Sequence, residues 1–330
     1  MSPSSGRRFA LRSSPFVLLD RWVAASPISG VEAYKWSVSV YARNERLNLA
    51  SCLRAIADAR VGNGTHITII LNGSSDSSDI IAHTLARHLQ LSAEIYDIRY
   101  GDKSNAINQF LYNLRPEAET YFFIDGHATI TRPALIELER GLSEADAAVA
   151  VPESQADTNA DGGLQGSLFA LRRSLVERIV GAGLKLPVGL YCGDRLIGSF
   201  VSNDLDPGDP TAEPRRSIRV VPAATWTVAP PSPWRRRDLS RQWRHRICQA
   251  RGRLENEAIK EIIYRDGYQG LPDHADRMIA EWIDKSPKTR RPNPIRDPFA
   301  ALAVRQIKRA SFPRDEDMVP HLLARTRPTI

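Results

Sequence analysis

The chain has 330 residues, a formal net charge of +7 and three cysteines. This length is enough for one large α/β domain with an extension, and no apolar run approaches the 18 or so residues of a membrane span. Cys52, Cys192 and Cys248 are far apart and odd in number. They therefore argue against a disulfide framework and indicate reduced thiols in a cytoplasmic protein.

The first 33 residues do not resemble the start of a folded domain. A short apolar stretch at residues 16–19 is interrupted at once by Asp20 and Arg21, so the pattern argues against a cleaved signal peptide. We expect residues 1–33 to form an extension that packs little against the rest of the chain.

Alternating strand and helix patterns begin after this extension. Residues 36–41 alternate apolar residues with serine, and residues 67–71 are apolar or β-branched. Both segments predict strands, and apolar residues at helical spacing follow each of them. A third strand is expected at residues 93–98, a further helix opens at residues 101–108, and a fourth strand ends at Asp125. Strands that alternate with helices indicate a mostly parallel sheet, which binds ligands at the carboxyl ends of its strands.

The most informative segment is the end of the fourth strand, where Asp125 and His127 follow a buried aromatic and aliphatic run. Residues i and i+2 of an extended chain point to the same face, so both side chains can approach one cation. Carboxylate and imidazole donors suit Mg²⁺ or Mn²⁺. The alternative is a strand that ends in an ordinary Asp-Gly turn without a ligand.

The ordered series of segments resembles the inverting family 2 glycosyltransferases, which have the GT-A fold. The resemblance extends over roughly residues 36–230. The segments that carry it are residues 37–56, 67–82, 101–111, 121–130, 163–179 and, more weakly, 186–201.

The resemblance implies a nucleotide-diphosphate sugar donor, first of all a UDP-sugar, and it assigns roles to individual positions. Asp76 would contact the nucleobase, and Lys103 and Asn105 would lie near the ribose and phosphates. Asp125 would lie near the ribose and the metal. The other donor-binding positions are Ala42, Arg43, Glu45 and Asn72. Asp76 has a second interpretation, because it also has the side chain and position of a helix cap.

The resemblance also implies a divalent cation, Mn²⁺ or Mg²⁺, held by an Asp-x-Asp motif. This chain departs from the motif, because His127 stands where the second acid is expected. An imidazole can ligate Mn²⁺ but brings no negative charge to the cation.

The reaction needs a base that removes a proton from the acceptor hydroxyl. By resemblance the best match is Asp194, which follows Gly193, and Arg195 beside it would keep the carboxylate ionised. Asp204 and Asp206 are the rival candidates. Gly166 would allow donor and acceptor to approach the backbone closely.

The composition changes after residue 230, so we expect a GT-A domain at residues 34–230 and a basic, mainly helical region at residues 231–330. Residues 240–246 contain a degenerate relative of the Gln-x-x-Arg-Trp segment of processive family members. Gln242, Trp243 and Arg244 are therefore candidates for contact with the acceptor or the pyrophosphate. A solvated basic helix face is the alternative.

The basic region has the charge to meet an anionic membrane surface, and the resemblance adds a glycan or a lipid-linked molecule as acceptor. Motifs of nucleic-acid-binding proteins do not accompany the charge, so nucleic acid is not expected as a partner. We expect a cytoplasmic protein that can lie at the inner face of the membrane.

Three functions are consistent with the sequence. The first is an inverting glycosyltransferase of the hexosyltransferase type that serves glycan or polysaccharide biosynthesis. The second is a nucleotidyltransferase, which would need a glycine-rich basic loop where residues 42–45 stand. The third is a non-catalytic module that binds a nucleotide sugar, which His127 favours.

Overall fold

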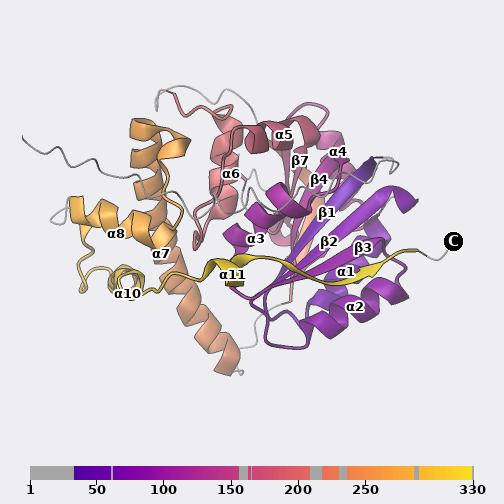
Figure 1. Ribbon diagram of the computed structural model, residues 1–330, viewed down its shortest axis with the longest axis horizontal. Coiled ribbons are helices and arrows are strands. Elements are labelled where there is room, and N and C mark those ends of the chain that lie inside the picture. Colours follow the sequence, from indigo (N-terminus) through magenta and orange to yellow (C-terminus); the bar gives the residue numbers. More distant parts are fainter. Residues whose placement is uncertain are drawn as a thin grey trace, which may run out of the picture. The chain divides into compact units, whose positions relative to one another are not determined.

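The computed structural model describes residues 33–60, 62–155, 163–164, 166–208, 218–229, 236–285 and 290–328 (Figure 1). Residues 1–32, which make up almost all of the expected extension, lie outside the described residues. The expected boundary at residue 230 does too.

The described residues form a nine-stranded sheet with the order β5-β8-β6-β7-β4-β1-β2-β3-β9. Helices alternate with its first four strands, as the sequence predicts. The strands are β1 (Tyr34–Ala42), β2 (Thr65–Asn72), β3 (Ala93–Ile98), β4 (Ala118–Asp125), β5 (Ala128–Ile130), β6 (Ala147–Pro152), β7 (Leu168–Arg172), β8 (Ile218–Val228) and β9 (His321–Thr326).

The sheet is mixed, which corrects the expectation of a mostly parallel one. Strand β1 pairs in parallel with β2 and β4, and β2 pairs in parallel with β3. In contrast, β7 runs antiparallel to both of its neighbours, β4 and β6, and β9 runs antiparallel to β3. The four strands predicted from the sequence therefore form one parallel group, and their carboxyl ends lie at one edge. Strands β6 and β8 form a second parallel pair.

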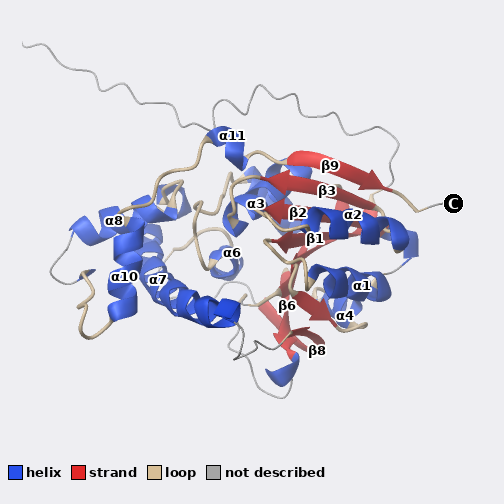
Figure 2. Cartoon of the chain, turned by 90° about the horizontal axis from the view of Figure 1, so that it is seen from below, coloured by secondary structure: helices blue, strands red, loops and turns tan. Residues whose placement is uncertain are grey.

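Helices cover both faces of the sheet (Figures 1 and 2). Residues of α1, α2 and α4 belong to one hydrophobic core, and residues of α3, α5, α6, α7 and α8 belong to the other. The helices are α1 (Leu49–Ala59), α2 (Ser78–His88), α3 (Lys103–Gln109), α4 (Ala134–Gly141), α5 (Arg173–Gly181), α6 (Gly193–Ser202), α7 (Arg236–Asp266), α8 (Ala275–Lys285), α10 (Pro298–Ile307) and α11 (Asp315–Met318).

The central strands are apolar on both faces, as a covered sheet requires. In β1 the side chains of Trp36, Val38 and Val40 are fully buried on the face covered by α1 and α4. In β4, Phe123 stacks on Phe169 of β7 with ring centroids 4.6 Å apart on the opposite face. These two cores fix β1 and β4 side by side, and the loops at their carboxyl ends are therefore held close together.

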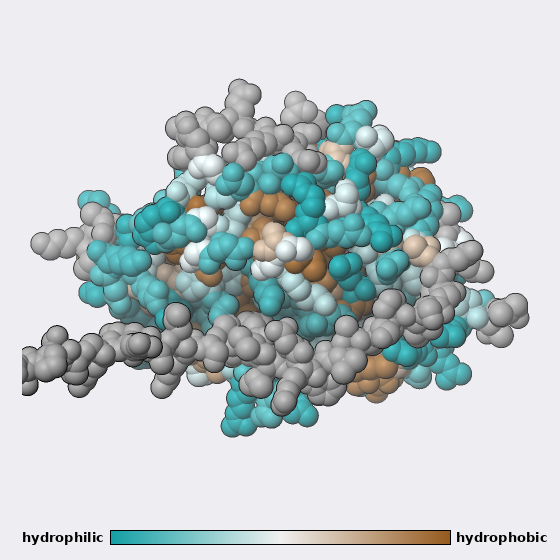
Figure 3. All heavy atoms as spheres, turned by 45° about the horizontal axis from the view of Figure 1, so that its top comes forward, coloured by the Kyte–Doolittle hydropathy of each residue, from teal (hydrophilic) through white to brown (hydrophobic). Residues whose placement is uncertain are grey.

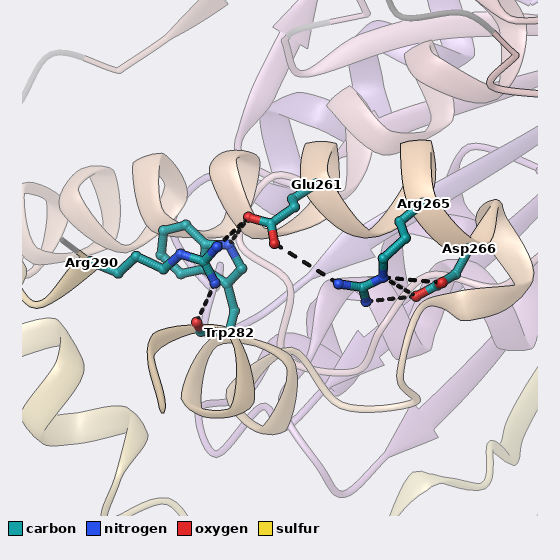
Figure 4. Close-up of polar contacts among 5 residues, drawn as sticks. All are labelled: Glu261, Arg265, Asp266, Trp282 and Arg290. Atoms are coloured by element: carbon teal, nitrogen blue, oxygen red, sulfur yellow. Dashed lines mark hydrogen bonds and ion pairs between the residues drawn. The ribbon is translucent and has the colours of Figure 1, made fainter. Parts of the chain in front are cut away.

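The C-terminal helices are joined by a polar cluster between α7 and α8 (Figure 4). Glu261 of α7 accepts hydrogen bonds from Trp282 Nε1 at 2.9 Å and from Arg290 Nη2 at 2.7 Å. The Arg290 guanidinium also lies over the Trp282 ring, 4.7 Å from its centroid.

The face in Figure 3 is mostly hydrophilic, with hydrophobic side chains gathered near its middle. None of the described helices is both long and apolar enough to cross a membrane.

Candidate functional site

The loops that follow β1 and β2 are bound to each other at the carboxyl edge of the sheet. The side-chain oxygen of Asn44 accepts a hydrogen bond from the Ser75 amide at 2.8 Å, and the Asn44 amide donates to Ser74 Oγ at 3.1 Å. Asn44 has φ 57°, in the left-handed region that asparagine tolerates better than most residues. The chain therefore turns sharply after β1, and the two loops form one polar surface.

The loop after β3 joins this surface through two glycines. Arg43 Nη1 donates to the Gly101 carbonyl at 2.7 Å, and a side chain at position 101 would place its Cβ 2.5 Å from the Arg43 guanidinium carbon. Gly73 has φ +68°, and a Cβ there would lie 2.4 Å from Gly101 Cα. Glycine is required at position 73, where the clash would be with backbone and φ is positive, whereas a side chain at position 101 would displace the Arg43 guanidinium.

Asp76 has a structural role in the loop after β2. One carboxylate oxygen accepts from the Arg46 amide at 3.0 Å, and the other accepts from the Ser78 amide at 3.2 Å, in the first turn of α2. Asp76 therefore binds an amide at the start of α2 from the position before the N-cap residue, Ser77, whose own side chain makes no capping hydrogen bond. Contact with a nucleobase would use the remaining lone pairs of the same carboxylate.

Three charged residues meet where β4, α3 and α6 begin or end. Lys103, the first residue of α3, places its Nζ 2.5 Å from Asp125 Oδ1, at the end of β4. Burial alone would lower the pKa of Lys103, but the charges of Asp125 and Asp194 outweigh it and the pKa is raised. Lys103 therefore carries its charge between two carboxylates, one from β4 and one from α6.

Asp194 is held in the first turn of α6. Its carboxylate accepts from the Gly166 amide at 3.3 Å and from the Arg195 amide at 3.0 Å. Burial raises the pKa of Asp194, against the opposing effects of the Lys103 charge and these two amides. A carboxylate with a raised pKa beside a lysine at the carboxyl edge of a parallel sheet is a candidate for a general base.

Gly166, which donates to Asp194, has φ +132°, a conformation that favours glycine. Its neighbour Ser167 places Oγ 3.4 Å from His127 Nε2. The turn that precedes β7 therefore touches both the candidate base and the segment after β4.

His127 lies between two partners. Its Nε2 faces Ser167, and its Nδ1 lies 3.8 Å from Glu45 Oε1. The other oxygen of Glu45 accepts from Asn48 Nδ2 at 2.8 Å. The loop after β1 therefore reaches the segment after β4, and Glu45 and His127, both predicted from the sequence, are neighbours.

The residues expected to bind a divalent cation do not form a metal-binding group. Asp125 is in contact with the Lys103 ammonium, and His127 faces Ser167 and Glu45. Among the described residues no cluster of three or more His, Cys, Asp or Glu side chains could hold a metal ion. A positive charge from the chain itself, that of Lys103, lies where a cation is expected.

Three of the predicted donor-binding positions, Ala42, Asn72 and Asn105, are buried. Asn105 is buried, and its Nδ2 donates to the Met318 carbonyl at 3.0 Å, which ties α3 to the C-terminal segment. Ala42 and Asn72 are also buried, at the ends of β1 and β2. Ala42 leaves no space for a side chain at Gly126, whose Cβ would lie 2.8 Å from Ala42 Cβ.

Trp243 and Arg244, two of the three residues predicted in α7, have exposed side chains. Trp243 is 55% exposed and packs edge-on against Phe299 of α10, with ring centroids 5.1 Å apart. Arg244 is exposed, and the side chain of Gln242 is outside the described residues. The role of these three residues in acceptor or pyrophosphate binding stays a prediction.

Comparison with known proteins identifies the fold. No protein-family model matches the chain, and no curated protein matches its sequence. A solved structure of the mannosyltransferase PcManGT from Pyrobaculum calidifontis, in complex with GDP-Man and Mn²⁺, is 16% identical. It has a TM-score of 0.54, and the match covers 84% of this chain and 85% of that one.

TarS from S. aureus in complex with UDP-GlcNAc is 14% identical with a TM-score of 0.49, over 83% of this chain and 80% of that one. That similarity is too low to carry an argument. The similarity to PcManGT shows that the chain has the fold of GT-A glycosyltransferases. At this identity the similarity establishes the fold alone.

Proposed function

We propose that this chain is an inverting glycosyltransferase of family 2 type that uses a nucleotide-diphosphate sugar. The observation that carries the proposal is the cluster of Asp125, Lys103 and Asp194 at the carboxyl ends of the strands of a GT-A fold. In open α/β sheets this edge is where ligands bind. In this arrangement Lys103 can contact the leaving diphosphate while Asp194 acts as the base.

In this proposal Asp194 is the general base. It accepts the proton of an acceptor hydroxyl as the oxygen attacks the anomeric carbon from the side opposite the leaving diphosphate. The bond from the anomeric carbon to the diphosphate oxygen breaks, and the diphosphate leaves with the bonding electrons. Lys103 stabilises the negative charge that develops on the diphosphate.

The donor would lie over the loops after β1, β2 and β3. The side chains of Arg43 and Asp76 lie in these loops, and Glu45 reaches from the first of them toward His127. PcManGT was solved in complex with GDP-Man. For this chain the resemblance of its sequence motifs makes a UDP-sugar the first candidate donor. The proposed acceptor is the hydroxyl of a glycan or of a lipid-linked molecule at the inner face of the membrane.

Whether a metal ion helps the diphosphate to leave is a question for experiment. The structural neighbour PcManGT was solved with Mn²⁺, but here Asp125 already forms an ion pair with Lys103. We therefore assign the stabilisation of the leaving group to Lys103 and describe no step that uses a metal.

The test is thermal unfolding of the full chain with a panel of nucleoside diphosphates and nucleotide sugars, each with and without Mn²⁺. A ligand that binds only the folded state raises its stability by RT ln(1 + [L]/Kd), about 2.7 kcal/mol at a hundredfold excess over Kd. We expect the ligands that carry one particular nucleobase to raise the unfolding temperature more than the others. A panel in which no nucleotide raises the unfolding temperature would contradict the proposal.

One observation supports a second candidate, a non-catalytic module that binds a nucleotide sugar. His127 replaces the second acid of the motif, and no described metal-binding group compensates for it. The two candidates differ in turnover. The glycosyltransferase releases nucleoside diphosphate when donor and acceptor are both present, whereas the binding module does not.

A further inference from the structure

Residues 186–192 connect the core to Asp194, and side chains from other elements bind their backbone. Asn108 of α3 donates to the Leu186 carbonyl at 2.8 Å and accepts from the Leu186 amide at 2.9 Å. Ser104 of α3 donates to the Leu190 carbonyl at 3.0 Å. Residues 186–192 lie outside the sheet and make a single isolated bridge, at Val188, so these side chains set the course of the segment.

Gly189, in the middle of the segment, is held from two sides. Its amide donates to Asp102, the N-cap residue of α3, at 2.9 Å, and its carbonyl accepts from Arg251 Nη2 of α7 at 2.6 Å. Asp102 also caps α3 by accepting from the Asn105 amide at 2.6 Å. The helix that begins with Lys103 and the segment that leads to Asp194 therefore share one carboxylate.

Glu255 of α7 binds the end of the segment. Its side chain is fully buried, and Oε2 accepts from the Tyr191 amide at 2.9 Å, three residues before Asp194. Oε1 accepts from Arg251 Nε at 2.7 Å, and Arg251 Nη1 lies 2.8 Å from Asp276. Burying a carboxylate is costly unless it is paired and hydrogen-bonded, and here both conditions are met.

We propose that Glu255, oriented by Arg251, is a positioning residue that holds the segment 189–192 and thereby fixes the place of Asp194 in the crevice. The inference rests on the proposed function of Asp194. Glu255 itself is separated from the reacting atoms by the backbone that it binds. Because a misplacement of about 1 Å can cost about a hundredfold in rate, such a contact affects turnover more than donor binding.

The first test is Glu255→Gln in the full chain. Glutamine keeps the shape but offers only one acceptor oxygen, so it cannot accept from both Tyr191 and Arg251. We expect kcat to fall about 10- to 100-fold, the range for a small misplacement of a reacting group, while the KM for the donor stays within about twofold. The control is Glu281→Gln, which breaks an exposed i,i+4 pair with Arg277 on α8.

Amide hydrogen exchange provides a readout that does not depend on activity. In the wild type the Tyr191 amide should exchange slowly, and in Glu255→Gln it should exchange at least about tenfold faster, with no such change in Glu281→Gln. Arg251→Lys gives a second variant if Glu255→Gln does not fold. Lysine keeps the charge but not the fork that reaches both Glu255 and Gly189, so a smaller loss of kcat at unchanged donor KM is expected.

The inference is overturned if a folded Glu255→Gln has wild-type kcat, if kcat falls no more than in Glu281→Gln, or if Tyr191 exchanges at the wild-type rate. If the wild type itself releases no nucleoside diphosphate from any donor, the proposed function fails. The exchange of Tyr191 then decides separately whether Glu255 holds the segment.

Discussion

Lys103 Nζ lies 2.5 Å from Asp125 Oδ1, so the first residue of α3 is joined to the last residue of β4 at the edge where ligands bind parallel sheets. The same ammonium lowers the pKa of Asp194, whose pKa burial raises. One cation therefore influences both a candidate donor-binding carboxylate and the candidate base.

Removing that cation should weaken binding of the donor nucleotide. We expect Lys103→Met to reduce the affinity for the nucleoside diphosphate that stabilises the wild type by about 1.5–3 kcal/mol, the range for a hydrogen bond to a charged group. Calorimetric titration measures the change. Lys35→Met is the matched control, because Lys35 pairs with Glu139 at 3.1 Å and lies near the start of β1 instead of its end. Equal affinities for Lys103→Met and wild type would exclude a diphosphate contact.

The same substitution should shift the pH dependence of turnover. The base must be ionised, and burial raises the pKa of Asp194, so the acid limb of kcat/KM should lie above the ordinary aspartate pKa of about 3.9. The rate is then full at higher pH and falls as pH drops through that limb. Lys103→Met removes a charge that lowers this pKa, so its acid limb should move to higher pH. An acid limb that moves to lower pH would contradict the assignment.

A second carboxylate in the motif should create a better metal site. His127→Asp adds one negative charge near Asp125. At about 4 Å in water, the attraction between that charge and a divalent cation is about 2 kcal/mol, or roughly thirtyfold in affinity. Titration with Mn²⁺ in the presence of the nucleoside diphosphate measures this gain. His88→Asp is a control, because His88 lies in the last turn of α2. The same affinity for Mn²⁺ in wild type and His127→Asp would show that residue 127 does not face the cation.

Loss of Asp76 should affect the stability of the fold as well as the nucleotide. Its two carboxylate oxygens bind the amides of Arg46 and Ser78, and removal of a helix cap costs about 0.5–2 kcal/mol. We therefore expect Asp76→Ala to lower the free energy of unfolding by that amount, measured by urea denaturation, and to weaken nucleotide binding. The exposed Asp79, in the first turn of α2, serves as the control. An unchanged free energy of unfolding would rule out the capping role.

The sequence predicts the parallel part of the fold well, because its signals are local. The strands that end at Ala42, Asn72 and Asp125 are rich in apolar and β-branched residues and largely buried, and helical periodicity follows the first two. The mixed character of the sheet was not predicted. Strand β9 is mostly exposed and shows no alternation, so only its pairing with β3, more than two hundred residues away in sequence, makes it a strand.

Long-range contacts also decide which polar residues face the crevice. Asn105 lies where a ribose contact is expected, yet its side chain binds the carbonyl of Met318, 213 positions further along the chain. Glu255 lies in a helix whose composition suggests a solvated basic face, and its complete burial depends on Arg251 and the Tyr191 amide. No local pattern identifies either contact, since both depend on where α7 and the C-terminal segment pack.

The rival bases are separated by the geometry of α6. Asp194 lies in the first turn of this helix, and Asp204 lies two residues beyond its end, where it pairs with Arg178. From Asp194 to the last residue of α6, Ser202, the helix axis is about 12 Å long at 1.5 Å per residue. The two carboxylates therefore cannot serve the same anomeric carbon, which makes Asp204 a suitable control for the central experiment.

That experiment measures nucleoside-diphosphate release from the donor that stabilises the wild type, with a panel of acceptors, for wild type, Asp194→Asn and Asp204→Asn. Loss of a positioned general base costs about 10²–10⁴ in rate, so Asp194→Asn should lose turnover by that factor while its affinity for the nucleoside diphosphate is retained. Asp204→Asn should keep wild-type turnover. Wild-type turnover in Asp194→Asn, or its loss in Asp204→Asn alone, would contradict the account.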